Sequence, residues 1–191
     1  MKDKTIKILT VLLIVLVIIL IIILGVITGK MLYNKQMIKK VSTIYIANID
    51  IQKEKVKDKN SIIKIDGNNV VGILKIDKIN FEGLVYEGIN TNILKNGVGH
   101  FDNSPIFNGN ACFAAHNYWN YWSKLHKLKA GDNIEYISYL GRREYQVCKV
   151  QEIDDTDWSL LKNTEENQIT LITCIKNKPE KRLCVQGKEK F

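Results

Sequence analysis

The chain has 191 residues, a length that allows one folded domain with an appendage but not two full hydrophobic cores. Its formal net charge of +8 is spread among acidic residues, without an arginine-rich stripe or a nucleic-acid-binding motif, so nucleic acid is not expected as a partner. The spacings between its cysteines fit no zinc-binding pattern, and most of them lie within apolar strand-like runs, which favours free thiols over a disulfide framework. The cysteines are Cys112, Cys148, Cys174 and Cys184.

A long apolar run dominates the N-terminal part of the chain. Residues 8–29 are predicted to be a transmembrane anchor, because an apolar helix of about 20 residues spans the roughly 30 Å hydrocarbon core of a bilayer. A cleaved signal peptide is the alternative, but its apolar region usually has only about 7 to 15 residues and ends at a small-residue cleavage site. We therefore expect a single-pass membrane protein. Residues 1–7 are expected to form a cytoplasmic N-terminus, although lysines flank the span on both sides and the charges alone indicate no orientation.

Residues 30–60 are rich in Lys, Ile and Asn and are predicted to form a stalk or linker, partly helical at first. From about residue 61 the pattern changes to short β runs separated by turn signals. Residues 93–97 are predicted to form a helical turn that ends at a glycine cap. About seven or eight short strands with few helices predict a mainly β fold, a closed or nearly closed antiparallel barrel. The clearest predicted strands are 70–76, 84–86, 111–116, 134–139, 145–150, 169–174 and 183–186.

Cys174 has the most favourable position for reaction among the cysteines. It ends the predicted strand 169–174 and precedes a polar turn, and reactive groups are usually presented where a rigid scaffold meets a loop. A buried structural cysteine at a strand terminus is the alternative interpretation of the same position.

A thiol nucleophile needs a proton donor for the leaving group and a cation where oxyanion charge develops. Arg182 begins the next predicted strand, and the short turn of residues 175–181 can return the chain beside Cys174. His116 ends an apolar strand, whereas the other two histidines, His100 and His126, are expected to be structural or solvated. Cys174, His116 and Arg182 therefore form the candidate catalytic group.

Four segments resemble motifs of the sortase family, in that family's order, over roughly residues 70–188. Residues 170–174 (Thr-Leu-Ile-Thr-Cys), with Arg182 eight residues on, resemble the signature T-L-x-T-C followed by Arg. Residues 97–101 and 109–117 resemble the G-x-G-H and G-N-x-x-x-A-x-H segments, and residues 125–132 resemble the L-x-x-L-x-x-G-D turn. The resemblance implies an eight-stranded sortase β-barrel as the catalytic domain, residues 61–191.

The resemblance also implies an activity, that of a cysteine transpeptidase. Cys174 would attack an LPxTG-like sorting signal between Thr and Gly, Arg182 would stabilise the oxyanion, and His116 would transfer the proton. The product would be joined to an amine of the peptidoglycan precursor. The short segment 151–168 and the lack of an Asp-Pro-aromatic lid before the barrel make class D the most similar subclass.

Partners and location follow from the same resemblance. The expected partners are secreted proteins with a C-terminal sorting signal, the cell-wall amine and the cell membrane, with the catalytic domain extracellular and no cofactor. Thr173 and Asn117 are predicted to contact the substrate, although Asn117 can also orient His116 or simply turn the chain.

Several alternatives stay open at this stage. The chain can be a membrane-tethered cysteine protease that only hydrolyses, or a β-barrel binding module without catalysis. A regulatory Cys174–Cys184 disulfide is conceivable, since Cys184 shares strand parity with Arg182. The aromatic residues after His116 are expected to pack in the core rather than to line the active site or touch a bilayer. These are Tyr118, Trp119, Tyr121 and Trp122.

An acidic segment before the Cys174 strand raises the question of a metal site. Calcium is bound by oxygen ligands, but the spacing of these carboxylates matches no calcium-binding pattern, so a solvated loop without a metal is expected. The acidic residues are Asp154, Asp155, Asp157, Glu165 and Glu166.

Overall fold

The computed structural model describes residues 2–51 and 63–190, which divide into two compact units, Met1–Lys40 and Val41–Phe191. Of the predicted linker, residues 30–40 fall in the first unit and 41–51 in the second, and residues 52–60 lie outside the described residues. The division of the chain into anchor, linker and catalytic domain stays a prediction.

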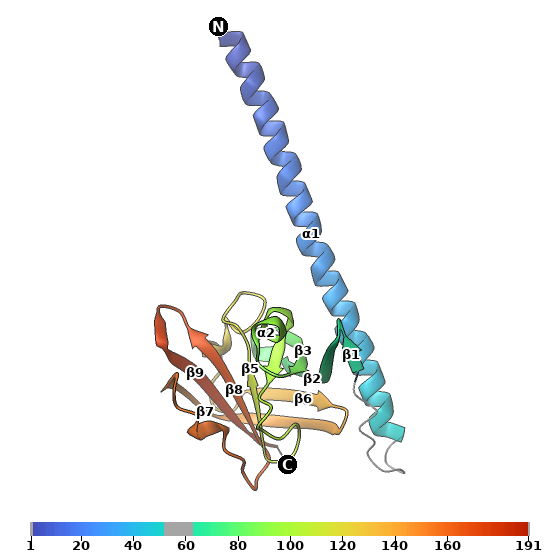
Figure 1. The fold of residues 1–191 in the computed structure, drawn as a ribbon, viewed down its shortest axis with the longest axis vertical. Helices are drawn as coiled ribbons and strands as arrows, with labels where there is room; N and C mark the ends of the chain where they lie inside the picture. The colour runs from blue at the N-terminus through green and yellow to red at the C-terminus, as the bar shows by residue number, and fades with distance from the viewer. Residues whose placement is uncertain (1, 52–62, 191) are drawn as a thin grey trace. The chain divides into compact units, whose positions relative to one another are not determined.

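The first unit is the long N-terminal part of helix α1 (Lys2–Ile51; Figure 1). Among the described residues, α1 is the one helix long and apolar enough to cross a membrane, over Lys4–Ala47. Its aliphatic side chains are exposed, and Thr10 and Thr28 donate their hydroxyl protons to carbonyls one turn earlier, at 2.9 Å. Because every polar group within lipid must be satisfied internally, this segment fits a single membrane span.

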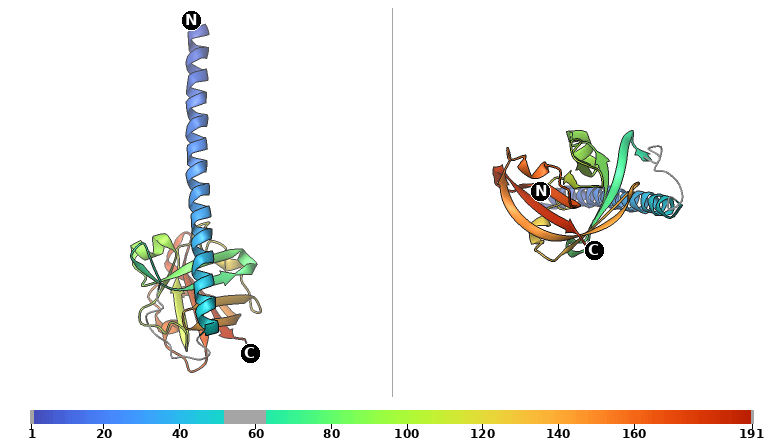
Figure 2. Two further views of the ribbon diagram at one scale, coloured as in Figure 1. Left: turned by 90° about the vertical axis from the view of Figure 1, so that its right-hand side faces the viewer. Right: turned by 90° about the horizontal axis from the view of Figure 1, so that it is seen from below.

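The second unit contains a closed β-barrel whose strands curve around a common interior (Figures 1 and 2). The strand order is β2-β3-β4-β5-β8-β9-β7-β6, and pairing of β2 with β6 closes the ring, while the short β1 pairs with the start of β2. The predicted mainly β, eight-stranded closed barrel is therefore confirmed. The strands are β1 (Ile63–Ile65), β2 (Asn68–Ile76), β3 (Phe81–Glu87), β4 (Val98–His100), β5 (Asn110–Ala114), β6 (Asn133–Ser138), β7 (Gly141–Asp154), β8 (Gln168–Ile175) and β9 (Lys178–Glu189).

Two of the strand pairs are parallel, β3–β4 and β5–β8, so the barrel is not wholly antiparallel as the sequence suggested. Parallel neighbours require a crossover connection, and β3 reaches β4 through helix α2 (Thr91–Asn96). Asn90 caps α2 by accepting hydrogen bonds from two backbone N–H groups, and Gly97 follows its last residue, which confirms the predicted helical turn. The 3-10 helices are η2 (Asp77–Ile79), η3 (Leu125–Lys127) and η4 (Ser159–Leu161).

Side chains along β8 alternate between two apolar clusters, as the period of a strand requires. Ile169 and Leu171 belong to the main core inside the barrel, whereas Ile172 belongs to a second cluster on the outer face of the sheet. We call this second group the outer cluster: Phe101, Cys112, Ile153, Leu161, Ile172 and Cys184.

The C-terminal part of α1 is part of the barrel's own unit. Val41 and Tyr45, one helical turn apart, are fully buried, and the Tyr45 hydroxyl donates a hydrogen bond to the carbonyl of Val70 on β2. The two buried side chains are thus four residues apart, the spacing that places them on one face of the helix.

Candidate active site

Two neighbouring strands, β8 and β9, and the segment that follows β5 carry the predicted catalytic residues at one edge of the barrel. β5 and β8 are parallel with Ala114 opposite Ile172, and continuing this register by two residues brings His116 beside Cys174. β8 and β9 are antiparallel with Cys174 directly opposite Arg182. Adjacent strands lie about 4.8 Å apart and opposed residues share a face, so the order His116, Cys174, Arg182 forms a row on the outer face.

Hydrogen bonds on both sides of His116 hold this segment against β8. The Ala115 N–H donates to the carbonyl of Ile172 at 3.3 Å, and the Thr173 hydroxyl donates to the carbonyl of Ala115 at 2.7 Å. On the other side, the Asn117 side-chain amide donates to the carbonyl of Cys174 at 2.7 Å. Because β5 ends at Ala114, these contacts extend the parallel pairing to the position of Cys174.

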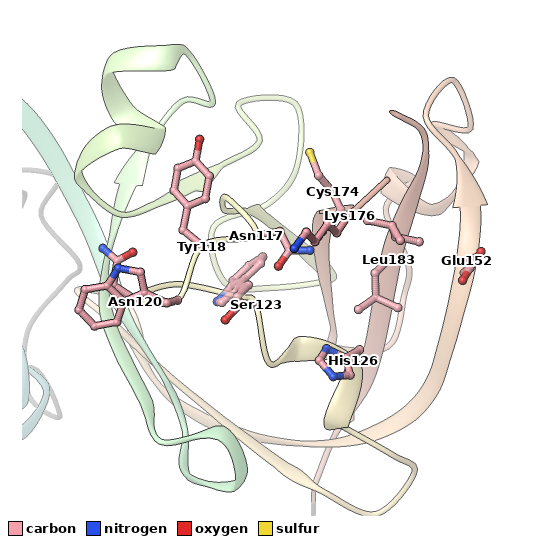
Figure 3. A pocket seen from close by; sticks show the side chains of 12 residues that line it. Asn117, Tyr118, Asn120, Ser123, His126, Glu152, Cys174, Lys176 and Leu183 are labelled. Carbon is pink, nitrogen blue, oxygen red and sulfur yellow. The ribbon is translucent and has the colours of Figure 1, made fainter. Parts of the chain in front are cut away.

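Cys174 and His116 differ in their exposure to solvent. The Cys174 side chain is exposed, and in Figure 3 its sulfur points away from His126 and Leu183. His116 is half-buried, and its ring stacks on the ring of Tyr118, with centroids 4.8 Å apart and planes inclined by 27°. The thiol is therefore accessible, while one face of the imidazole is covered by the ring of Tyr118.

Arg182 is fixed by a bulge at the end of the β8–β9 hairpin. The pairing passes from Cys174 with Arg182 directly to Ile175 with Lys178, which leaves three residues of β9 without a partner on β8, although Lys181 still pairs with Asp154 of β7. The Arg182 Nη1 donates to the carbonyls of Pro179 and Lys181, at 2.6 and 2.9 Å. The guanidinium thus bonds carbonyls that the bulge removes from the β8–β9 ladder.

The bulge also corrects the predicted connection. The expected turn of residues 175–181 is in fact a tight turn at Lys176 and Asn177, with Asn177 at φ 63°. Asn tolerates this left-handed conformation, and Pro179 lies in the bulge, where no ladder hydrogen bond is required of it. Arg182 therefore lies within β9 rather than at its start.

An ion pair that the sequence did not indicate joins Arg182 to the segment before β8. Arg182 Nη2 and Asp155 Oδ2 are 3.6 Å apart, and the Asp155 N–H donates to the carbonyl of Glu180 at 2.9 Å. Asp155 and Arg182 are far apart in the chain, and only the pairing of β7 with β9 brings their surroundings together. The sequence alone did not give the register of β7 against β9, so this ion pair could not be predicted from it.

The two predicted substrate contacts occupy different positions. Thr173 is buried with its hydroxyl bonded to Ala115, so a contact with substrate would have to come from its backbone. Asn117 is half-buried at the rim, and its amide bonds the Cys174 carbonyl. A hydrogen bond from Asn117 to β8 was not foreseen, since the sequence offered only the substrate, His116 or a turn.

The other cysteines are separated from this row by burial or by position. Burial raises the pKa of the Cys112 and Cys184 thiols to about 12, from an ordinary value of 9.0. Cys184 is paired with Ile172, so it is a diagonal neighbour of Cys174 across the two strands. Such neighbours are about 7–8 Å apart, beyond the usual Cα separation of a disulfide, and both thiols are free. Cys148 is exposed on β7.

The remaining histidines lie outside the row. His100 is buried, with Nδ1 at 3.0 Å from Glu87 Oε1 and Nε2 at 3.0 Å from the Ser104 hydroxyl, which agrees with a structural role. His126 is exposed on η3, as expected for a solvated residue.

Most acidic side chains from the end of β7 to the start of β8 have basic or hydroxyl partners. Asp154 pairs with Lys181 and Glu166 with Lys188, both at 2.6 Å. Hydrogen bonds from the Ser159 side chain and backbone lower the pKa of Asp157. Across residues 2–51 and 63–190, no group of three or more His, Cys, Asp or Glu side chains is arranged to hold a metal ion.

A pocket of about 850 Å³ borders Cys174 (Figure 3). The segment after His116 forms one wall, and the ends of β7, β8 and β9 form the other. We call it the Trp119 pocket, and its lining residues are Asn117, Tyr118, Trp119, Asn120, Trp122, Ser123, His126, Glu152, Cys174, Ile175, Lys176 and Leu183.

The aromatic residues after His116 divide between the core and the surface. Trp122 is buried and Tyr121 is partly buried against the main core, as expected. Tyr118 and Trp119 are 57% and 71% exposed, so the expectation of core packing is wrong for these two. The segment is a series of turns, so it has no strand-like alternation from which buried and exposed aromatic residues could be told apart in the sequence.

Comparisons with known proteins agree with this architecture. The sortase domain model matches residues 74–190. Sortase A of Listeria monocytogenes serovar 1/2a is 30% identical over 138 residues, which cover 68% of this chain and 62%, less than two thirds, of that protein. Sortase D of Bacillus subtilis strain 168 is 30% identical over 143 residues, which cover 71% of each chain. The crystal structure of Listeria monocytogenes sortase A matches with a TM-score of 0.60 at 30% identity, over 64% of this chain and 88% of that one.

Proposed function

The chain belongs to the sortase family, and on this premise we propose that it is a membrane-anchored cysteine transpeptidase with a Cys174 nucleophile. His116 is the proton shuttle and Arg182 the oxyanion partner. The observation that supports this assignment is the row of the three residues on adjacent strands, with an exposed thiol in its middle.

The proposed first step is acylation of Cys174. Its thiolate attacks the Thr carbonyl carbon of an LPxTG-like sorting signal, and Arg182 stabilises the oxyanion of the tetrahedral intermediate. The bond to the Gly nitrogen breaks, His116 gives its proton to that nitrogen, and a thioester remains. Among the described contacts of Arg182, only Nη1 and Nη2 are engaged, so the guanidinium keeps donors for the oxyanion.

The second step transfers the acyl group to an amine of the peptidoglycan precursor. The neutral amine attacks the thioester carbon, its proton passes to His116, and the carbon–sulfur bond breaks to release the Cys174 thiolate. Secreted proteins with a C-terminal sorting signal are the proposed acyl donors. Residues 1–7 are then cytoplasmic and the barrel extracellular, because the donors and the wall precursor both lie outside the cell.

The exposed Cys174 thiol marks where the sorting signal must lie on the outer face of β8. Next to it, Ile172 and Cys184 are buried in the outer cluster, so a bound peptide would run along the residues that cover this cluster rather than along these two side chains. Thr173 contributes its backbone, since its hydroxyl is engaged with Ala115. Asn117 lies at the end of this path beside the Cys174 carbonyl.

Class D is the proposed subclass. The segment between β7 and β8 contains only the three-residue η4, so it has no room for the long helical insertion of class B. Relatives of two subclasses, sortase A and sortase D, are equally similar at 30% identity, and the argument therefore rests on this short segment.

The proposal is tested by thioester capture. Purified full-length protein in detergent is incubated with a sorting-signal peptide, and the adduct is detected by mass spectrometry and by its cleavage with hydroxylamine. We expect Cys174→Ala to abolish the adduct and Cys148→Ala, which removes the other exposed thiol, to retain it. An adduct that persists in Cys174→Ala would refute the assignment.

The same assay separates the two alternatives. Addition of triglycine should yield ligated peptide; a protein that releases only free acid would be a hydrolytic protease. Failure of the unmodified protein to form any adduct with a panel of sorting peptides would favour a binding module without catalysis.

A further inference from the structure

A carboxylate lies beside Arg182, on the side away from the thiol. β9 lies between β8 and β7 in the sheet, so Arg182 has Cys174 opposite it on one strand and Ile153 on the other. Asp155 follows Ile153 by two residues, and its Oδ2 is 3.6 Å from Arg182 Nη2. The catalytic row therefore continues from imidazole, thiol and guanidinium to a fourth group, the Asp155 carboxylate.

The bulge in β9 fixes the backbone of Asp155 as well as the Arg182 side chain. The Asp155 N–H donates to the carbonyl of Glu180 at 2.9 Å, and the carbonyls on either side of Glu180 accept from Arg182. The side chains of Arg182 and Asp155 are 28% and 38% exposed, so water and salt screen their attraction less than they screen fully exposed charges. The carboxylate is therefore presented to the guanidinium from a fixed point.

Arg182 is held at two of its three side-chain nitrogens, and Asp155 supplies the second point. Nη1 donates to the carbonyls of Pro179 and Lys181, which fixes one corner of the guanidinium. The guanidinium plane can still swing about that corner unless a second nitrogen is held, and Asp155 holds Nη2. Of the five N–H donors, the Nε–H and one Nη2–H have no partner among the contacts of the described residues.

The geometry of the ion pair leaves these two donors accessible. A carboxylate that blocked the guanidinium would form a bidentate pair with two of its nitrogens at hydrogen-bond distance. Asp155 Oδ2 instead lies 3.6 Å from Nη2, which is longer than a hydrogen bond. Asp155 therefore orients Arg182 without occupying the donors that an oxyanion needs.

We propose that Asp155 is a positioning residue, which orients the Arg182 guanidinium toward the oxyanion that forms at Cys174. This inference rests on the proposed transpeptidase function. Because Asp155 lies on the β7 side of β9 and Cys174 on the β8 side, the carboxylate acts through Arg182 and not on the reacting atoms. Donors stabilise developing charge best when they are oriented before it appears, so a guanidinium released from Asp155 stabilises the oxyanion less.

The test compares Asp155→Asn, which keeps the shape of the side chain and removes its charge, with the unmodified protein. Full-length protein in detergent is mixed with a sorting-signal peptide, and single-turnover thioester formation is followed at increasing peptide concentration. We expect the maximal rate to fall about fivefold, which corresponds to about 1 kcal/mol, while the peptide concentration for half-maximal rate stays the same. Asp155→Glu should recover most of the rate, since its longer side chain brings the same charge to Nη2.

Asp154→Asn is the matched control. Asp154 is the neighbouring carboxylate, and it pairs with Lys181 at 2.6 Å rather than with Arg182. The control should form the thioester at the rate of the unmodified protein.

Alkylation by iodoacetamide separates the guanidinium from the thiol. It is measured in a Cys148→Ala background, which leaves Cys174 as the exposed thiol. Alkylation forms no oxyanion, so Asp155→Asn should not slow it.

Thioester formation at an unchanged or higher rate in Asp155→Asn would overturn the inference, as would an equal loss in Asp154→Asn or a matching loss of alkylation. Absence of any thioester in the unmodified protein would instead refute the proposed function.

Discussion

At the scale of single residues, Asn117 shows how a side chain can support the reaction without contacting the substrate. Its amide fixes the segment after His116 to the carbonyl of Cys174 at 2.7 Å. Loss of this bond frees His116 relative to Cys174, although the bonds of Ala115 to β8 remain. Asn117 is therefore a candidate positioning residue for the proton shuttle.

Asn117→Asp keeps the shape of the side chain but replaces the amide donor by an acceptor. We expect kcat to fall about tenfold, the effect of losing one hydrogen bond of about 1 kcal/mol plus repulsion between two oxygens. KM for the sorting peptide should change little. A rise in KM with an unchanged kcat would show instead that Asn117 binds the peptide directly, as the sequence suggested. Steady-state kinetics separate the two roles.

The buried thiols predict a dependence of stability on pH. The folded pKa of Cys184 is about 12, above its ordinary value of 9.0, because burial disfavours the thiolate. Above about pH 9 the unfolded chain loses this proton while the folded chain keeps it, so the free energy of unfolding is fully retained below pH 9 and falls as pH rises toward 12. At pH 10.5 the contribution of one such thiol is at most about 2 kcal/mol.

Cys184→Ala should reduce the fall in unfolding free energy between pH 8 and pH 10.5, measured by urea titration. Cys148→Ala removes a solvent-exposed thiol and should leave the fall unchanged. The buried hydroxyls of Tyr45 and Tyr145, whose pKa burial also raises to about 12, keep part of the pH dependence in both variants. Equal slopes for the two cysteine variants would contradict the prediction.

At the scale of elements, the last turns of α1 predict where the barrel unit begins. Val41 and Tyr45 are buried in that unit, and Tyr45 bonds the Val70 carbonyl. A soluble fragment starting at residue 41 should therefore unfold at a higher temperature than one starting at residue 61, the predicted boundary. Loss of one buried aromatic side chain costs about 3–5 kcal/mol, which corresponds to roughly 10 °C for a domain of this size.

Tyr45→Ala in the full-length chain provides an independent check on this prediction. It should lower the melting temperature of the barrel by a similar amount. Calorimetry of the two fragments that gives equal melting temperatures would show that α1 does not stabilise the barrel.

The elements that the sequence predicted share a strong local pattern. The runs 70–76, 111–116 and 169–174 are apolar and overlap β2, β5 and β8. β4 was missed because a three-residue strand containing Gly99 has too few side chains for a period. The bulge in β9 was missed because Pro179 normally indicates a turn, and only the pairing with β8 shows that the strand continues through it.

The candidate site was predictable for a different reason. Cys174 and Arg182 lie on consecutive strands of one hairpin, so their proximity follows from local sequence. His116 lies two residues past the end of β5, and its place beside Cys174 depends on a parallel pairing of β5 with β8 that no local pattern contains. The family resemblance supplied that information.

At the scale of the whole molecule, closure of the barrel depends on Gly72. Gly72 pairs with Ser138 where β2 meets β6, and a Cβ there would lie 2.7 Å from the carbonyl oxygen of Ile137 and would also meet the ring of Tyr136. Because a backbone atom cannot move aside as a side chain does, Gly72→Ala should destabilise the barrel by about 1–3 kcal/mol.

Gly83→Ala on the neighbouring β3 is the matched control. Its Cβ would meet a side chain, the end of the Phe81 ring at 2.7 Å, rather than a backbone atom. Urea unfolding should therefore rank Gly72→Ala well below Gly83→Ala in stability. The reverse ranking would show that the β2–β6 contact is looser than the register indicates.

The position of β9 constrains the order in which the barrel can assemble. β7 and β8 precede β9 in the chain, yet β9 lies between them and pairs with both. A chain emerging from the ribosome therefore has unsatisfied edges on β7 and β8 until β9 is inserted; the β8–β9 pairing is a local hairpin, whereas the β7–β9 pairing joins residues further apart in the sequence and is expected to form more slowly. Arg182 arrives with β9, so the thiol stays without its guanidinium neighbour until that strand is in place.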